Sequence, residues 1–132
     1  MSQPPESVQE WIAYARSHLT AARAAAGQSI LWAIPCFEAQ QAAETAIKGV
    51  LIYFGTRPPR IHDIGRLLDL LPPELDTTVG VEASPGLTRY AFVTRYPGGA
   101  VPVTEDDYRE ALRLAEAVVA WADSVIGRKP ST

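Results

Sequence analysis

The chain has 132 residues, of which 47% are apolar and 20% are charged, and its formal net charge is −3. This length suits one domain with a real hydrophobic core, and the composition excludes a disordered chain, a collagen-like repeat and a disulfide scaffold. Cys36 is the single cysteine. An internal disulfide is therefore impossible, and a reducing compartment is expected.

The first residues are polar, and the chain has no uncharged run of about 18 apolar residues. We therefore expect a cytoplasmic protein that neither carries a signal peptide nor crosses a membrane.

The first predicted helix opens at Pro4-Pro5, because proline costs nothing in the first helical turn, and Gly27 ends it. A second helix is predicted over about residues 29–54, with Ser29 as its N-cap and Gly55 as its stop. Pro35 lies inside this span, so either the helix kinks there or the regular helix begins only near it.

A short helix is predicted over about residues 62–71, and residues 74–84 are expected to form a loop. Ser84-Pro85 is typical of a helix start and predicts a helix over residues 85–96. Thr104 to Asp107 resembles a capping box that opens a last helix ending at Ile126. Together these elements predict an all-α, up-and-down antiparallel bundle of three long and two short helices. We expect one domain over residues 1–132, with its core at about residues 6–127.

Polar side chains concentrate on the second predicted helix. Gln41, Glu44 and Lys48 lie at steps of three and four and share a stripe, in which Glu44 and Lys48 would form an exposed pair worth only about 0.3–0.5 kcal/mol. Apolar side chains such as Phe37 lie on the same arc. The stripe is therefore either a solvated surface or a protein interface or ligand cleft.

A second set of residues is cationic. Arginine presents a planar donor fork that suits phosphate, and arginine beside aromatic residues is common in protein interfaces. The alternative is scattered surface charge, and the net charge of −3 argues against broad nucleic-acid binding. The set comprises Arg57, Arg60, His62, Arg66, Arg89 and Arg95, the last followed by Tyr96.

Metal and cofactor chemistry is not expected. His18 and His62 lack partners at metal-ligand spacing, and Cys36 lies on an alanine-rich helix face where a buried thiol is inert. Gly98-Gly99 lacks the spacing of a phosphate-binding loop.

Three segments carry a family resemblance. They are Ala33 to Lys48 (AIPCFEAQQAAETAIK), Ile61-His62-Asp63-Ile64 and Arg95-Tyr96-Pro97, preceded by Trp11 on the first helix. Together they resemble the HEPN domain family, whose name stands for higher eukaryotes and prokaryotes nucleotide-binding. The resemblance implies a bundle of about five helices that usually forms a homodimer. It also implies a minimal nucleotidyltransferase as a frequent partner, in a two-component or toxin–antitoxin arrangement.

Many relatives are RNA-cleaving toxins, whose site is an arginine followed after four to six residues by a histidine in the second helical hairpin. Here Arg95 lies in that region, but no histidine follows it. Arg57 and His62 have the spacing, yet they flank the Pro58-Pro59 loop, outside the place of the motif.

Two further positions depart from the family pattern. Glu38 stands where many members have histidine, and His18 where the pattern often has aspartate.

The leading interpretation is a non-catalytic HEPN protein that forms a homodimer and binds a nucleotide, an RNA or a minimal nucleotidyltransferase. No catalytic residue is assigned. The alternatives are a metal-independent HEPN ribonuclease toxin that uses Arg57 and His62, and a purely structural interaction module. The candidate binding residues are Gln41, Glu44, Lys48, His62, Asp63, Arg95 and Tyr96.

Overall fold

The computed structural model describes residues 7–27, 30–91 and 102–127. Within these ranges the chain is helical and contains no strand, which confirms the all-α prediction. The elements are α1 (Val8–Ala24), α2 (Ala33–Tyr53), α3 (Ile64–Leu68), α4 (Val79–Ala83), the 3₁₀-helix η1 (Ser84–Ala91) and α5 (Glu105–Ile126). No helix in the described part of the chain is long and apolar enough to cross a bilayer.

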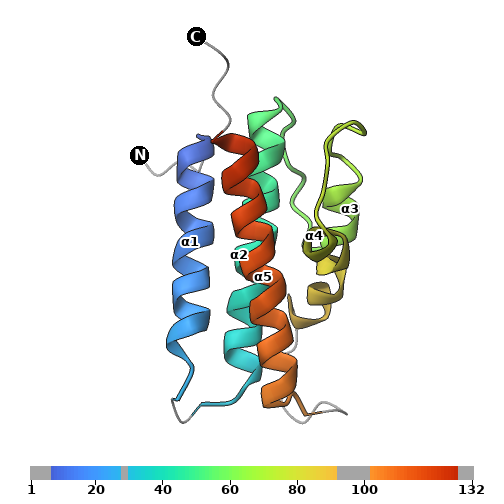
Figure 1. Ribbon diagram of the computed structural model, residues 1–132. Coiled ribbons are helices and arrows are strands. Elements are labelled where there is room, and N and C mark those ends of the chain that lie inside the picture. Colours follow the sequence, from blue (N-terminus) through green and yellow to red (C-terminus); the bar gives the residue numbers. More distant parts are fainter. Residues whose placement is uncertain (1–6, 28–29, 92–101, 128–132) are drawn as a thin grey trace.

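The long helices α1, α2 and α5 stand side by side, and the short elements α3 and α4 lie on the side away from α1 (Figure 1). α1 is antiparallel to α5, because Arg16 pairs with Asp123 and Arg23 with Glu116. It is also antiparallel to α2 (Figure 1). Consequently α2 and α5 run in the same direction, and the segment from α3 to η1 returns the chain to the start of α5.

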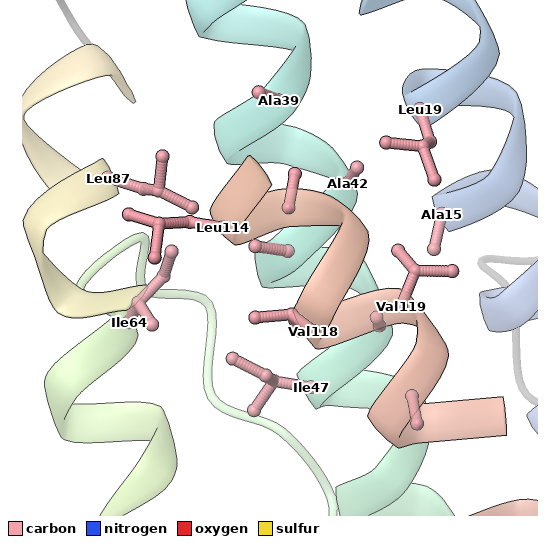
Figure 2. Close-up of a cluster of buried hydrophobic side chains, with 14 of the residues drawn as sticks. Ala15, Leu19, Ala39, Ala42, Ile47, Ile64, Leu87, Leu114, Val118 and Val119 are labelled. Carbon is pink, nitrogen blue, oxygen red and sulfur yellow. The ribbon is translucent and has the colours of Figure 1, made fainter. Parts of the chain in front are cut away.

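The core fills the space between these helices. α2 is buried along almost its whole length and contacts α1, α5, α3 and η1, as expected for a central helix. Its alanines and Gly49 allow close approach: a Cβ placed on Gly49 would lie 3.1 Å from the Cβ of Trp11. Figure 2 shows core side chains from all sides of the bundle, among them Leu19, Ala42, Ile47, Ile64, Leu87, Leu114 and Val118.

The helix starts depend on capping side chains. α1 begins at Val8 with Ser7 as N-cap and a capping box to Glu10. The predicted helix start at Pro4-Pro5 lies outside the described residues. α5 begins behind Thr104 with a capping box to Asp107, as predicted. In both cases a hydroxyl accepts from a backbone N–H that the first turn leaves without an intrahelical partner.

α2 begins at Ala33, so Pro35 lies in its first turn, where a missing N–H costs nothing. Of the two possibilities for Pro35, the later helix start is therefore the one observed. Ser29 lies outside the described residues, and Trp32 occupies the N-cap position without a side-chain hydrogen bond. Gly55 ends the helix as predicted, with a left-handed φ of +83°.

Three predictions between α2 and α5 were wrong. The third helix is shorter than residues 62–71, because Asp63 caps it and places His62 before its start. Residues 74–84 contain α4, which Thr78 caps and α5 supports by packing. The hydroxyl of Ser84 donates to the carbonyl of Val81 instead of capping a new helix, and the chain continues as η1. The rest of the helix predicted over residues 85–96 lies outside the described residues.

Candidate functional site

A buried carboxylate organises the polar residues of α2. Glu44 is only 4% exposed. Its Oε1 accepts a hydrogen bond from Nε2 of Gln40 at 2.8 Å, and its Oε2 accepts one from Nζ of Lys48 at 2.8 Å. Nδ1 of His62, in the segment before α3, lies 3.0 Å from Oε1 and 3.2 Å from Oε2. Glu44 therefore joins two turns of α2 to the α2–α3 segment.

The contact with Glu44 determines which ring nitrogen of His62 carries a hydrogen. An ionised carboxylate can only accept hydrogen bonds, so Nδ1 of His62 must carry the proton that faces Glu44. The imidazole is thereby held with its Nδ1 edge toward Glu44, while 47% of the side chain remains exposed. His62 thus stands at the boundary between the buried network and the surface.

The predicted exposure of the Glu44–Lys48 pair was wrong. The two side chains are 6% and 10% exposed, since they lie on a central helix that contacts α1, α5, η1 and α3. Burial changes the energetics of the pair. An exposed pair contributes less than about 1 kcal/mol, whereas removal of one partner from a buried pair costs about 3–5 kcal/mol.

Gln40 is the member of this network that the sequence did not single out as a site residue. It is fully buried, and it lies one helical turn before Glu44, as Lys48 lies one turn after it. The repeated four-residue spacing Gln40–Glu44–Lys48 was the available signal. Oε1 of Gln40 has no hydrogen-bond partner among the described residues, so one acceptor of the network remains unpaired there.

The other predicted site residues are not part of this network. Gln41 lies partly exposed on the adjacent face of α2. Asp63 caps α3, since its Oδ1 accepts from the backbone N–H of Arg66 at 3.2 Å. Arg57 is exposed in the loop that follows α2. Arg95 and Tyr96 lie outside the described residues.

A second polar contact joins α1 and α2. Nδ1 of His18 is 2.7 Å from Oε1 of Glu38, and the two side chains are 30% and 28% exposed. These are the two positions that depart from the family pattern, and they contact each other.

Arg89 forms a third polar cluster, at the start of α5. Its guanidinium lies 4.6 Å above the ring of Tyr90, donates to the Tyr90 hydroxyl and lies 3.3 Å from Oδ1 of Asp107. The Thr104 backbone N–H, with Arg89, holds the pKa of Asp107 below its ordinary value. Cys36 is buried nearby, and burial, with the charge of Asp107, raises its pKa to about 12. Cys36 is buried, as the sequence predicted, and we expect its thiol to be unreactive.

Two of the open depressions in the described part of the chain lie away from the Glu44 network. One has a volume of about 560 Å³ and lies between α3 and α4, where Asp63, Arg66 and Glu82 contribute to its wall. The other, of about 630 Å³, lies between α4 and α5 beside Trp121. Within the described ranges no three metal-binding side chains are grouped so that they could hold an ion.

The fold and the α2 residues can now be compared with known proteins. Residues 8–125 match the sequence model of the HEPN domain. The chain belongs to the HEPN domain family. This family membership confirms the resemblance carried by residues 33–48 and by the His62-Asp63 segment.

Two crystal structures share the fold of this HEPN domain. One is of TT1696 from Thermus thermophilus, which is 34% identical in sequence with a TM-score of 0.79, over 92% of this chain and 99% of that one. The other is of ST0689, described as an archaeal HEPN homologue, which is 27% identical with a TM-score of 0.73 over the same shares. A comparison with curated proteins gives no significant match.

Proposed function

We propose that this HEPN domain is a non-catalytic binding module that works as a homodimer and binds the phosphate of a nucleotide or an RNA beside Lys48 and His62. One observation favours this site above the others. A single buried carboxylate, Glu44, contacts both the ammonium of Lys48 and the imidazole of His62, and 47% of the His62 side chain is exposed. Side chains held in advance lose less entropy when a ligand binds.

The charges around this site suit an anion. Lys48 has three N–H donors, and the ammonium lies 2.8 Å from Glu44 through one of them. The loop that carries His62 also carries Arg57 and Arg60, both exposed. Arginine binds phosphate through two parallel N–H donors, so these two side chains can add to the attraction of Lys48.

A thermal-shift titration with ATP, GTP and a short RNA tests the proposal. A ligand at 100 times its dissociation constant should stabilise the protein by about 2.7 kcal/mol. The Lys48→Met variant, which keeps an unbranched side chain only one atom shorter and removes its charge, should lose this shift. Arg109→Met is the matched control, because Arg109 is exposed on α5 and pairs only locally with Glu105.

Because Lys48→Met leaves Glu44 buried without its cation, a second variant avoids that cost. The double variant Arg57→Gln/Arg60→Gln changes exposed side chains only and should weaken binding without a loss of stability. If neither variant reduces the ligand-induced shift, the assigned site is wrong. If none of the three ligands shifts the melting temperature of the unmodified protein, the domain is better described as a structural interaction module.

The protein partner that the family resemblance favours is a minimal nucleotidyltransferase, in a toxin–antitoxin-like pair. Purification of the tagged chain from its native host, followed by mass spectrometry, tests this part of the proposal. A nucleotidyltransferase that co-purifies in stoichiometric amount supports it. Recovery of the chain alone, from cells that express such an enzyme, contradicts it.

A ribonuclease that uses Arg57 and His62 is the second candidate. The contact between His62 and Glu44 favours it, because a carboxylate that fixes one ring nitrogen orients the imidazole for proton transfer. The absence of a histidine after Arg95 favours the non-catalytic alternative. If the purified protein cleaves RNA and His62→Ala slows cleavage by about 10²–10⁴-fold, the ribonuclease is the correct assignment.

A further inference from the structure

The depression between α3 and α4 carries charged groups that the proposed phosphate site does not use. Its volume is about 560 Å³, which lies within the range of about 300–1,000 Å³ that is usual for small-molecule pockets. We call it the α3–α4 pocket. One guanidinium and three carboxylates line it, and none of them belongs to the Glu44 network: Arg66, Asp63, Asp69 and Glu82.

Arg66 is the group that distinguishes this pocket. Most arginines in the described ranges form an ion pair with a carboxylate of this chain: Arg16, Arg23, Arg89, Arg109 and Arg113. Arg66 forms none with any described residue, although three carboxylates line the same pocket. The backbone therefore holds opposite charges apart. A guanidinium in this state can bind the carboxylate of a ligand through two parallel N–H donors.

Two of the three carboxylates are available to a ligand. Asp63 caps α3, since its Oδ1 accepts from the backbone N–H of Arg66. Glu82 accepts one hydrogen bond, from the hydroxyl of Thr77 at 3.2 Å, and retains further acceptor positions. The side chain of Asp69 has no hydrogen bond or ion pair in the described part of the chain. Asp69 and Glu82 can therefore each accept from a cationic group.

The carboxylates do not converge on one point. Among the described residues, no three metal-binding side chains are grouped so that they could hold an ion, and this includes Asp63, Asp69 and Glu82. The guanidinium of Arg66 in the same wall also repels a metal ion. The arrangement therefore suits an extended ligand with separate charged groups rather than a single ion.

The pocket also has an apolar part and a fixed frame. Leu68, Val81 and Pro85 line it together with the charged residues. Such a surface suits the alkyl chain of an amphipathic cation, which keeps its charged end in a polar setting. The frame is held by hydrogen bonds: the backbone N–H of Ile64 donates to the hydroxyl of Thr88 at 3.0 Å, and Thr78 caps α4.

We infer that the α3–α4 pocket binds a free basic α-amino acid of the lysine type. The ligand carboxylate pairs with Arg66, and its two ammonium groups pair with Asp69 and Glu82. The alkyl chain lies against the apolar part of the wall. Two cations and one anion on the ligand thus match two available carboxylates and one unpaired guanidinium on the protein. This inference goes beyond the proposed phosphate site and does not depend on it.

Simpler ligands leave one of these groups unmatched. A diamine brings two cations to the pocket but leaves Arg66 without a counter-charge. An apolar amino acid pairs with Arg66 but leaves one of the two available carboxylates unpaired. A phosphate faces three carboxylates, so like charges repel it from this wall.

Calorimetric titration of the full chain with L-lysine and three analogues tests the inference. Each analogue lacks one charged group: cadaverine the carboxylate, ε-aminocaproate the α-ammonium and norleucine the side-chain ammonium. Lysine should bind saturably, and each analogue should bind about tenfold or more weakly, because it loses one charged contact. Absence of saturable lysine binding, or equal affinity for lysine and any of the three analogues, overturns the inference.

The Arg66→Gln variant tests the role of the guanidinium. Its affinity for lysine should fall about tenfold or more, while its affinity for cadaverine should stay equal or rise, because only lysine has a carboxylate. A merely structural role for Arg66 would weaken both ligands together. Arg109→Gln is the matched control, because Arg109 is exposed on α5 and does not line the pocket. Unchanged lysine affinity in Arg66→Gln overturns the inference.

Two variants test the carboxylates. Asp69→Asn and Glu82→Gln change exposed side chains, and each should weaken lysine binding about tenfold. Asp106→Asn is the control, because Asp106 is an exposed carboxylate in the first turn of α5, outside the pocket. If Asp106→Asn weakens lysine binding as much as the two pocket variants, the effect is one of overall charge and the assigned contacts are wrong.

A last arm separates two sources of the same chemistry. Nα-acetyl-lysine presents a carboxylate and a side-chain ammonium, as the C-terminal lysine of a peptide does, but has no α-ammonium. We expect it to bind about tenfold more weakly than lysine. If it binds as tightly as lysine or more tightly, the pocket takes a peptide C-terminus and the assignment to a free amino acid is wrong.

Discussion

Gly80 of α4 packs directly on Ala117 of α5. A Cβ placed on Gly80 would lie 2.5 Å from the Cβ of Ala117, closer than two carbon atoms can approach without a shift of the backbone. The absence of a side chain at residue 80 therefore allows α4 to dock on α5. Val81, the next residue, is fully buried in the core as a result of this docking.

Gly80→Ala should destabilise the protein by about 1–3 kcal/mol, because the added methyl group overpacks the α4–α5 contact. Urea denaturation measures the change. Gly86→Ala is the matched control, since nothing lies within 4 Å of a Cβ at that position. Equal stability of the two variants would show that α4 does not pack on α5 in solution.

Glu44→Ala should cost about 3–5 kcal/mol, because it leaves the ammonium of Lys48 buried without a counter-charge. The comparison is Glu105→Ala, which also removes a carboxylate from a pair of four-residue spacing, but at the surface of α5. The surface variant should lose less than about 1 kcal/mol. Similar losses for both variants in urea denaturation would contradict the burial of the Glu44–Lys48 pair.

Protonation of Asp107 should make the stability of the folded protein fall at acidic pH. Its pKa is held below the ordinary aspartate value of 3.8, chiefly by a hydrogen bond from the Thr104 backbone N–H. The ionised carboxylate of Asp107 therefore stabilises the folded state. This stabilisation is complete above the ordinary pKa and is lost as the pH falls through the lower folded-state pKa.

Asp107→Asn should therefore flatten the loss of stability between about pH 5 and about pH 2, as measured by thermal unfolding at a series of pH values. Asp106→Asn removes a carboxylate from the same turn, away from the Thr104 capping contact, and serves as the control. An unchanged acid profile for Asp107→Asn would refute the role assigned to the capping box.

Cys36 should resist alkylation in the folded protein. Burial raises its pKa to about 12, so the reactive thiolate is almost absent at pH 8. Mass spectrometry after treatment with iodoacetamide should find the native chain unlabelled and the chain in guanidinium fully labelled. Labelling of the native chain at the rate of a free thiol would contradict the burial of Cys36.

Local signals in the sequence were sufficient to predict the long helices. The apolar steps of α5 and its Thr104–Asp107 box depend on neighbouring residues only, and both were predicted. Gly55 likewise ends α2 through its own backbone conformation. α4 was missed because its five residues are stabilised by the Thr78 cap and by the contact of Gly80 with α5. That contact joins residues far apart in the sequence.

The candidate site was only partly predictable for the same reason. The spacing of Gln41, Glu44 and Lys48 placed them on α2, but it gave no information on which neighbours cover which side of the helix. The elements packed around α2 leave Glu44 and Lys48 buried, and the loop before α3 brings His62 to Glu44. Gln41, three residues from Glu44, remains on the open face.

The most direct test of a non-catalytic phosphate-binding module is calorimetric titration with ATP and with a short RNA. Both the unmodified protein and Lys48→Met are titrated, and the RNA is recovered afterwards to check whether it was cleaved. The account predicts saturable binding of at least one ligand, an affinity about tenfold or more lower for Lys48→Met, and intact RNA at the end. Absence of saturable binding to either ligand, equal affinity of the two proteins, or cleaved RNA would contradict it.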